Sequence, residues 1–171
     1  MTSHRFPPLL RSSAGLMGLL TFGLAAVPQP TCAKPPVRQP PQQLPVESHW
    51  CLPQGDCILL EVADEPREKI LGLQLRSRLA PLRGMWFPYS EPQVLRFWMH
   101  RTPEPLDMIF LREKRVIAIE ANAIPCPHLP CRSYGPDQDS DGVVELAAGE
   151  AERLRIVVGM SAAIAPIEGR R

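Results

Sequence analysis

The sequence lacks the motifs by which several large enzyme classes are identified. It has no Gly-x-Ser-x-Gly nucleophile motif, no glycine-rich phosphate loop and no His-Glu-x-x-His zinc motif. Its cysteines do not have the Cys-x-x-Cys spacing of thiol oxidoreductases. Any activity therefore has to be argued from single residues.

The sequence also lacks an excess of charge of either sign. It contains 19 Lys and Arg against 18 Asp and Glu. A protein that binds nucleic acid or an anionic membrane surface needs a basic face, which this balance does not indicate. We therefore expect no nucleic-acid partner. Because the 171 residues contain no internal repeats, the length predicts one domain.

An apolar run long enough to span a membrane is missing from the N-terminal region. The run from Leu16 to Val27 is shorter than the roughly 20 residues that a spanning helix needs. Arg5 and Arg11 precede it, and small residues lead to Ala33, the pattern of a secretory signal peptide. We predict a signal peptide over 1–33, export to the periplasm or the medium, and no stable membrane anchor after processing. A retained anchor is the alternative.

Proline is plentiful directly after this segment. Residues 28–48 contain seven prolines and no apolar periodicity. Such a composition predicts an extended linker that buries no core. We therefore assign 34–48 to a Pro/Gln-rich linker and 49–167 to a single globular domain, which is long enough for one hydrophobic core.

Four cysteines remain after the predicted cleavage: Cys51, Cys57, Cys126 and Cys131. An even number of cysteines in an exported chain predicts disulfides. Each local pair encloses turn-forming residues, so we expect the bonds Cys51–Cys57 and Cys126–Cys131. The alternative is a zinc site that adds His49 or His128, but the cysteine spacings do not fit the usual zinc pattern.

Strands dominate the predicted elements of the domain. We expect a helix from Pro66 through 67–79 and a short one over 148–154. The predicted strands are 57–64, 84–89, 94–100, 106–111, 116–124, 143–146 and 156–160, with 106–111 and 116–124 forming a β-hairpin. These elements indicate an α+β domain with a mainly antiparallel curled sheet or a small β-barrel, and two short helices.

Four segments resemble a known family. They are "EVADEPREKILGLQLRSRL", "GMWFPYSEPQVLRFWMHRTPEPLDMIFL", "IPCPHLPCRSYG" and "VVELAAGEAERLRIVVGM". Their order is similar to that of the domain of unknown function family 192, which consists of small, often exported bacterial and archaeal domains. The family pattern favours Lys-Asn where this chain has His100 and Arg101. The resemblance implies a compact β-rich α+β fold and brings no established activity.

The stretch "FWMH" at 97–100 supplies the first candidate binding residues. On a strand, Trp98 and His100 point away from Phe97 and Met99. If the latter two face the core, Trp98 and His100 form a ledge that could bind a ligand, together with Tyr134 of the following loop. Packing of Trp98 under a loop is the alternative.

Asp107 opens an apolar strand, so we expect it to be partly buried and to need a partner. Its structural role would be to accept backbone hydrogen bonds or to pair with Arg83 or Arg101. Its functional role would be that of a general base with His100 as the acid.

The segment "DQDSDG" at 137–142 resembles the start of a calcium loop. Asp137, Asp139 and Asp141 are its candidate ligands, and Glu145 could add another. The twelfth position is Ala148, where an EF-hand has a glutamate, so we expect at most a weak site. We predict no cofactor and no tightly bound metal.

Three functions remain open from these residues. The first is a non-catalytic extracytoplasmic domain that binds a small polar ligand or an envelope protein at Trp98, His100, Asp107 and Tyr134. The second is an envelope hydrolase that uses Asp107 and His100. The third is a structural accessory protein.

Overall fold

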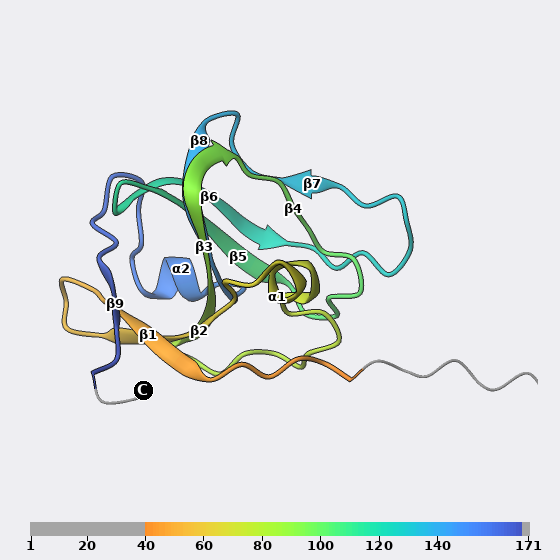
Figure 1. Cartoon of the computed structure of the whole chain (residues 1–171), viewed down its shortest axis with the longest axis horizontal. Coiled ribbons are helices and arrows are strands. Elements are labelled where there is room, and N and C mark those ends of the chain that lie inside the picture. The colour runs from red at the N-terminus through yellow and green to blue at the C-terminus, as the bar shows by residue number, and fades with distance from the viewer. Residues whose placement is uncertain (1–39, 169–171) are drawn as a thin grey trace, which may run out of the picture. The chain divides into compact units, whose positions relative to one another are not determined.

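The computed structural model describes residues 40–168, and they form a β-rich domain with two short helices (Figure 1). The predicted signal peptide lies outside these residues. The elements in chain order are β1 (Val46–Cys51), β2 (Cys57–Val62), α1 (Pro66–Leu71), β3 (Arg83–Val94), β4 (Phe97–Trp98), β5 (Leu106–Arg112), β6 (Arg115–Ala123), β7 (Ser133–Tyr134), β8 (Asp139–Ala147), α2 (Glu150–Arg153) and β9 (Ile164–Pro166).

Seven strands form one open mixed sheet in the order β6-β5-β8-β3-β2-β1-β9, and β4 pairs with β7 in a second, two-stranded sheet. The prediction of a mainly β domain is confirmed, but the curled sheet or small barrel is wrong. Neither sheet is closed among the residues described, because β6 and β9 are separate edges of the larger one. A barrel requires its first and last strands to pair.

One connection departs from the antiparallel pattern that the sequence predicts. β2 and β3 are parallel, with Leu60 opposite Gly84. Parallel neighbours need a crossover, and residues 63–82 supply it with α1 inside. The helix that we expected to run through 67–79 stops at Leu71, because Gly72 has φ +45° and the chain turns there.

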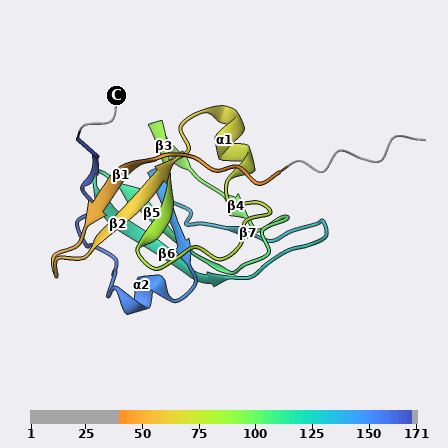
Figure 2. The same cartoon turned by 90° about the horizontal axis from the view of Figure 1, so that it is seen from below.

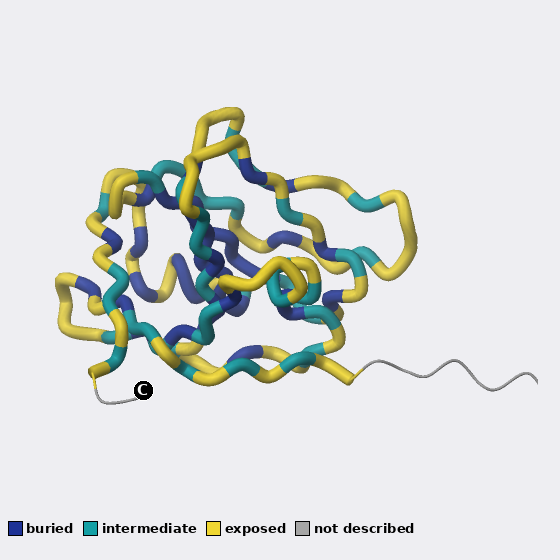
Figure 3. The backbone as a smooth tube through the Cα atoms, viewed as in Figure 1, coloured by how far each residue is buried: buried dark blue, intermediate teal, exposed yellow. Residues whose placement is uncertain are grey.

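The larger sheet is buried on both faces. Along β5, Leu106, Met108 and Phe110 enter one core cluster, whereas Ile109 and Leu111 enter the other. This alternation follows from the two-residue period of a strand. The helices lie on opposite sides of the sheet (Figure 2). Ala151 of α2 belongs to one core cluster, whereas Leu73, which follows α1, belongs to the other. The buried residues are concentrated in the central strands of this sheet (Figure 3).

The predicted β-hairpin is confirmed. β5 and β6 are antiparallel and joined by Glu113 and Lys114, which both have positive φ. Two central residues with positive φ give the turn that matches the twist of the flanking strands.

Two other predicted strands are wrong. Of the segment 94–100 only Phe97–Trp98 is a strand of its own, because β3 continues to Val94. The segment 156–160 is a turn, in which Val157 and Val158 are exposed, and the last strand is β9. The backbone of Val116 is bonded to Met160 and Gly159, so this turn caps the start of β6.

Both local disulfides are present, with Cα–Cα distances of 4.0 Å for Cys51–Cys57 and 5.8 Å for Cys126–Cys131. The first joins paired ends of β1 and β2. The second holds the mostly exposed loop that precedes β7 (Figure 3). Disulfides of this kind fit an oxidising compartment. They also leave no cysteine among 40–168 free for the zinc alternative.

The residues before β1 are not all free of contacts. Gln42 donates hydrogen bonds to the carbonyls of Glu68 and Gly72, at 3.0 and 2.9 Å. Leu44 packs against the core cluster of Met85 and Phe87. In the described part of the chain, no helix has the length and apolar character needed to cross a membrane.

Candidate functional site

Trp98 and His100 form the exposed ledge that the strand alternation predicts. Met99 is fully buried and Phe97 packs against the core, while Trp98 keeps 49% of its surface exposed. The centres of the Trp98 and His100 rings lie 5.5 Å apart. The ledge is attached to the disulfide loop, because His100 forms a β-bridge with Cys126.

Tyr134 lies beside this ledge but is not on its surface. It pairs with Phe97 across the small sheet and is buried in the core. Its hydroxyl accepts a hydrogen bond from the backbone N–H of Ile124 at 3.2 Å. Arg132 lies over the Tyr134 ring, 4.9 Å from its centre. Tyr134 therefore positions the loop rather than presenting its hydroxyl to a ligand.

Asp107 is separate from this group and is buried. Its two carboxylate oxygens accept backbone N–H bonds from Asn122 and Ala151, each at 2.9 Å. These bonds join β5 to the irregular end of β6 and to the first turn of α2. This is the backbone-bonding role considered for Asp107, and no hydrogen bond joins Asp107 to His100 in the described part of the chain.

The three candidate calcium ligands have different partners. Asp137 pairs with Arg96, Asp139 lies 3.9 Å from Arg112, and Asp141 accepts the N–H of Glu113. Among residues 40–168, no three acidic, histidine or cysteine side chains are grouped as metal ligands. The geometry therefore offers no preformed calcium loop.

Glu145 is the buried acid with the most unusual surroundings. It lies in the middle of β8, between Met85 of β3 and Met108 of β5 in register. Only 4% of its surface is exposed. Val143 and Ala147, its neighbours on the same face of β8, belong to the apolar cluster. Its carboxyl group therefore lies on an apolar face of the sheet.

No other described side chain pairs with this carboxyl group. Burial raises the pKa of Glu145 to about 8, and no hydrogen bond or ion pair to the carboxyl group among the described residues opposes the shift. Loss of hydration disfavours the charged form of an acid, which explains the direction of the shift. Burial raises the pKa of Tyr89, and the charge of ionised Glu145 raises it further. At neutral pH, the carboxyl group of Glu145 is therefore largely protonated.

A small cavity opens above this carboxyl group, and we call it the Glu145 cavity. It has a volume of about 30 Å³, enough for about two water molecules. Phe87 and Glu145 of the sheet line it, together with the end of α1, the turn that follows and the segment around Trp98. The full lining is Lys69, Ile70, Leu71, Gly72, Leu73, Gln74, Phe87, Phe97, Trp98, Thr102 and Glu145.

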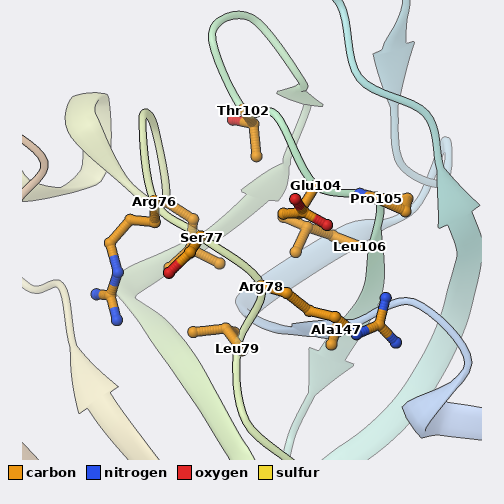
Figure 4. A pocket seen from close by; sticks show the side chains of 10 residues that line it. Arg76, Ser77, Arg78, Leu79, Thr102, Glu104, Pro105, Leu106 and Ala147 are labelled. Atoms are coloured by element: carbon orange, nitrogen blue, oxygen red, sulfur yellow. The ribbon is translucent and has the colours of Figure 1, made fainter.

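A second cavity shares Leu73 and Thr102 with the Glu145 cavity, and Figure 4 shows the side chains that line it. Its volume is about 10 Å³, which is close to the minimum for one water molecule. Arg76 and Arg78 point away from each other at its two sides (Figure 4). Arg76 forms a two-bond pair with Glu61, and Arg78 bonds the carbonyl of Ala148. Both arginines therefore attach the crossover loop to neighbouring parts of the domain.

Sequence analysis missed Glu145 as a binding residue and treated it only as a possible calcium ligand. The signal was available, because Glu145 interrupts the apolar stretch "VVELAA" in the way that Asp107 opens its strand. An acid inside such a strand is expected to be buried and in need of a partner. The residues of α1 and the crossover that line the cavity could not be predicted from the sequence, because only the fold brings them close to Glu145. Trp98 is the one predicted binding residue that lines this cavity.

The comparisons with solved structures return proteins without an established activity. A protein of unknown function from Novosphingobium aromaticivorans DSM 12444 is 30% identical, with a TM-score of 0.61, covering 70% of this chain and 83% of that one. A protein from Sinorhizobium meliloti 1021, described as a "putative transcription regulator", is 27% identical with a TM-score of 0.59, covering 70% of this chain and 92% of that one. No curated protein matches the chain.

The family comparison agrees with the resemblance seen in the four sequence segments. The model of DUF192, described as "Uncharacterized ACR", matches residues 51–164. These residues run from the end of β1 to the start of β9 and contain Trp98, Asp107 and Glu145. The chain belongs to the DUF192 family.

Proposed function

We propose that this protein is a non-catalytic binding domain, which takes a small polar ligand or a polar group of a partner protein into the Glu145 cavity. The observation that carries the proposal is the carboxyl group of Glu145, which is buried, has no partner in the described part of the chain, and lines an open cavity. Among the described residues, Ser140 Oγ is the one fully buried side-chain oxygen or nitrogen without a hydrogen-bond partner. The carboxyl group of Glu145 instead borders the cavity, where a ligand can form hydrogen bonds with it.

The surroundings of Glu145 suit binding because its position is rigid. Both neighbouring strands are hydrogen-bonded to β8, so the backbone that carries the carboxyl group is held on two sides. A group that is already in place loses little conformational freedom when a ligand arrives. The disulfide loop behind Trp98 adds a constraint at the other wall.

We further propose that binding takes place outside the cytoplasm. The two disulfides and the predicted signal peptide support this location. An envelope protein or a small solute of that compartment would be the partner.

The two alternative functions have less support. A hydrolase would need Asp107 as a base, yet both its oxygens accept backbone N–H bonds that hold the fold together. A general base has to be within hydrogen-bond reach of the proton it removes. A purely structural accessory protein would have no use for an unpartnered acid in its core.

The substitution Glu145→Leu tests the proposal through stability. If Glu145 is kept for binding, replacing it by an apolar side chain of similar size should raise the free energy of unfolding at pH 8 by about 1–3 kcal/mol. Such gains at the expense of function are common at binding sites. Denaturant titration measures the change, with Glu152→Leu at an exposed position of α2 as the matched control. A loss of stability in Glu145→Leu would mean that the acid is structural and would contradict the proposal.

A further inference from the structure

We infer that the group bound in the Glu145 cavity is a primary ammonium at the end of an alkyl chain. The inference rests on the proposed binding function and adds the chemical class of the ligand. It is carried by the coincidence of an unpartnered carboxyl group, aromatic walls and a very small volume at one place.

The carboxyl group of Glu145 favours a ligand that donates hydrogen bonds over an anion. Glu145 is the one acid and Lys69 the one base among the lining residues, and the carboxyl group of Glu145 lies at the sheet side of the cavity. An anion would be placed next to this group and would be repelled once the acid ionised. An ammonium has three N–H donors and no acceptor, so it can use both carboxylate oxygens.

The aromatic side chains favour a cation as well. Phe87, Phe97 and Trp98 all line the cavity, and the Phe87 and Phe97 rings meet edge to face at 5.1 Å. The face of an aromatic ring attracts a cation, most strongly in the case of Trp. A carboxylate with aromatic rings around it is therefore a suitable environment for a desolvated ammonium.

The volume distinguishes among cations. About 30 Å³ accommodates roughly two water-sized groups. A primary ammonium is a compact point charge on a thin stem, whereas a guanidinium is a wide planar group. The rim is apolar where the stem would leave the cavity, because Ile70 is 69% exposed and Trp98 is 49% exposed. A lysine side chain of a partner and a free alkylamine share this chemistry.

Lys69 of the chain itself is the competing occupant, because it also lines the cavity. Its Nζ atom lies 4.5 Å from the centre of the Tyr89 ring and forms no ion pair with Glu145 in the structure. If Lys69 were the natural partner of the carboxyl group, removing its ammonium would open the site, and added amines would bind more tightly. If the partner is external, removing it should change binding little.

Binding of an ammonium should be linked to loss of a proton from Glu145. Lys69 of α1 and Tyr89 of β3 are the titratable groups next to it, while β5 and the segment of β4 present Met108, Phe97 and Trp98. The pKa of Tyr89 is raised, first by burial and then by the charge of Glu145, which favours its neutral phenol. With a pKa of about 8 for Glu145, the ionised fraction rises about tenfold from pH 7 to pH 9. The affinity for an ammonium should rise by the same factor.

The test is an NMR titration of the full chain, with both disulfides intact, at pH 7 and pH 9. The probes are n-butylammonium, its neutral analogue 1-pentanol, methylguanidinium, and a blocked Ala-Lys-Ala peptide. We expect butylammonium to shift the Gly72 amide and the Trp98 indole signals, and to bind about tenfold more tightly at pH 9. Glu145→Gln should abolish this binding, whereas Glu152→Gln on the other side of the sheet should retain it. Lys69→Met changes a residue of the cavity wall, so it serves to test whether Lys69 is the natural occupant and is not a control.

The probes separate the possible failures. Equal binding of 1-pentanol, or binding of methylguanidinium as tight as that of butylammonium, would overturn the ammonium inference and leave the binding function intact. Tighter binding of butylammonium to Lys69→Met would assign the carboxyl group to Lys69 and overturn the inference of an external amine. If none of the probes shifts the NMR signals of the cavity residues, this result would contradict the binding function itself. If the peptide binds more tightly than butylammonium, the ammonium inference is supported and the ligand is a lysine side chain of a partner protein. If butylammonium binds more tightly than the peptide, the inference is supported and the ligand is a free alkylamine.

Discussion

Glu145 and Asp107 are both buried acids, but their carboxyl groups differ in their hydrogen-bond partners. Asp107 accepts two backbone hydrogen bonds and so repays the loss of its hydration. Glu145 has no such partner and instead has a raised pKa. The first acid therefore contributes to stability, while the second reduces stability whenever it is ionised.

This difference predicts how stability depends on pH. The pKa of Glu145 is about 8 in the folded protein, against an ordinary value of 4.5, so the folded state holds its proton more tightly than the unfolded state. The contribution is complete below about pH 4.5 and is lost as the pH rises to about 8. Over this window the protein should lose up to about 1.4 kcal/mol per pH unit relative to Glu145→Gln, which has no proton to lose.

Denaturant titrations of both proteins between pH 4 and pH 9 measure this loss. The difference in free energy of unfolding between them should change across the window and level off above pH 8. Parallel curves for the two proteins would show that Glu145 ionises at an ordinary pKa.

Asp107 gives the opposite expectation. In Asp107→Ala the N–H groups of Asn122 and Ala151 lose their acceptor inside the fold, which should lower the free energy of unfolding by about 3 kcal/mol. The exposed Asp139→Asn is the control and should change it by less than about 0.5 kcal/mol. A fully stable Asp107→Ala protein would reopen a catalytic role for this residue.

The loop between β6 and β7 has little regular structure and depends on a few attachments. They are the disulfide Cys126–Cys131, the bridge from His100 to Cys126, and the pairing of β4 with β7. Through them the loop supports the strand that carries Trp98, and thereby one wall of the Glu145 cavity.

Removing the disulfide should therefore loosen this loop more than the sheet. We expect the double variant Cys126→Ser, Cys131→Ser to fold with a lower melting temperature, since a bond closing so short a loop contributes about 2 kcal/mol. Hydrogen exchange should increase over 124–142 and much less over 106–122, where β5 is paired on both sides. A uniform increase over both segments would mean that the disulfide supports the whole domain.

The domain as a whole is a sheet buried on two faces, and among the residues described only one face carries a buried acid without a hydrogen-bond partner. The face with Trp50 and Leu154 is closed by α2 and apolar side chains. The face with Met85 and Phe110 includes Glu145 and has the cavity above it. This asymmetry separates the side that supports the fold from the side that we propose for binding.

The predicted export of the chain can be tested directly. If residues 1–33 are a signal peptide, the exported protein should begin near Lys34, and mass spectrometry of the intact protein should show that mass. A chain that still begins at Met1 in the membrane fraction would favour the retained anchor.

Local sequence was sufficient for the features that depend on neighbouring residues. Strand alternation predicts the outward Trp98 and the buried Met99, and the polar turn predicts the hairpin of β5 and β6. Short separations predict both disulfides. In each case the partners are close in the chain, so local periodicity and turn chemistry are enough.

The parallel pairing of β2 with β3, the open sheet and the Glu145 cavity depend on residues far apart in the chain. Periodicity marks which residues of a strand are buried, but it does not say which strand lies beside it or what covers its face. An acid at 145 can be recognised as unusual from "VVELAA" alone. Its meeting with Gly72, Phe87 and Trp98 arises because the 63–82 crossover and the segment after β3 both pack over the same face of the sheet, and only the folded arrangement of distant segments determines such a contact.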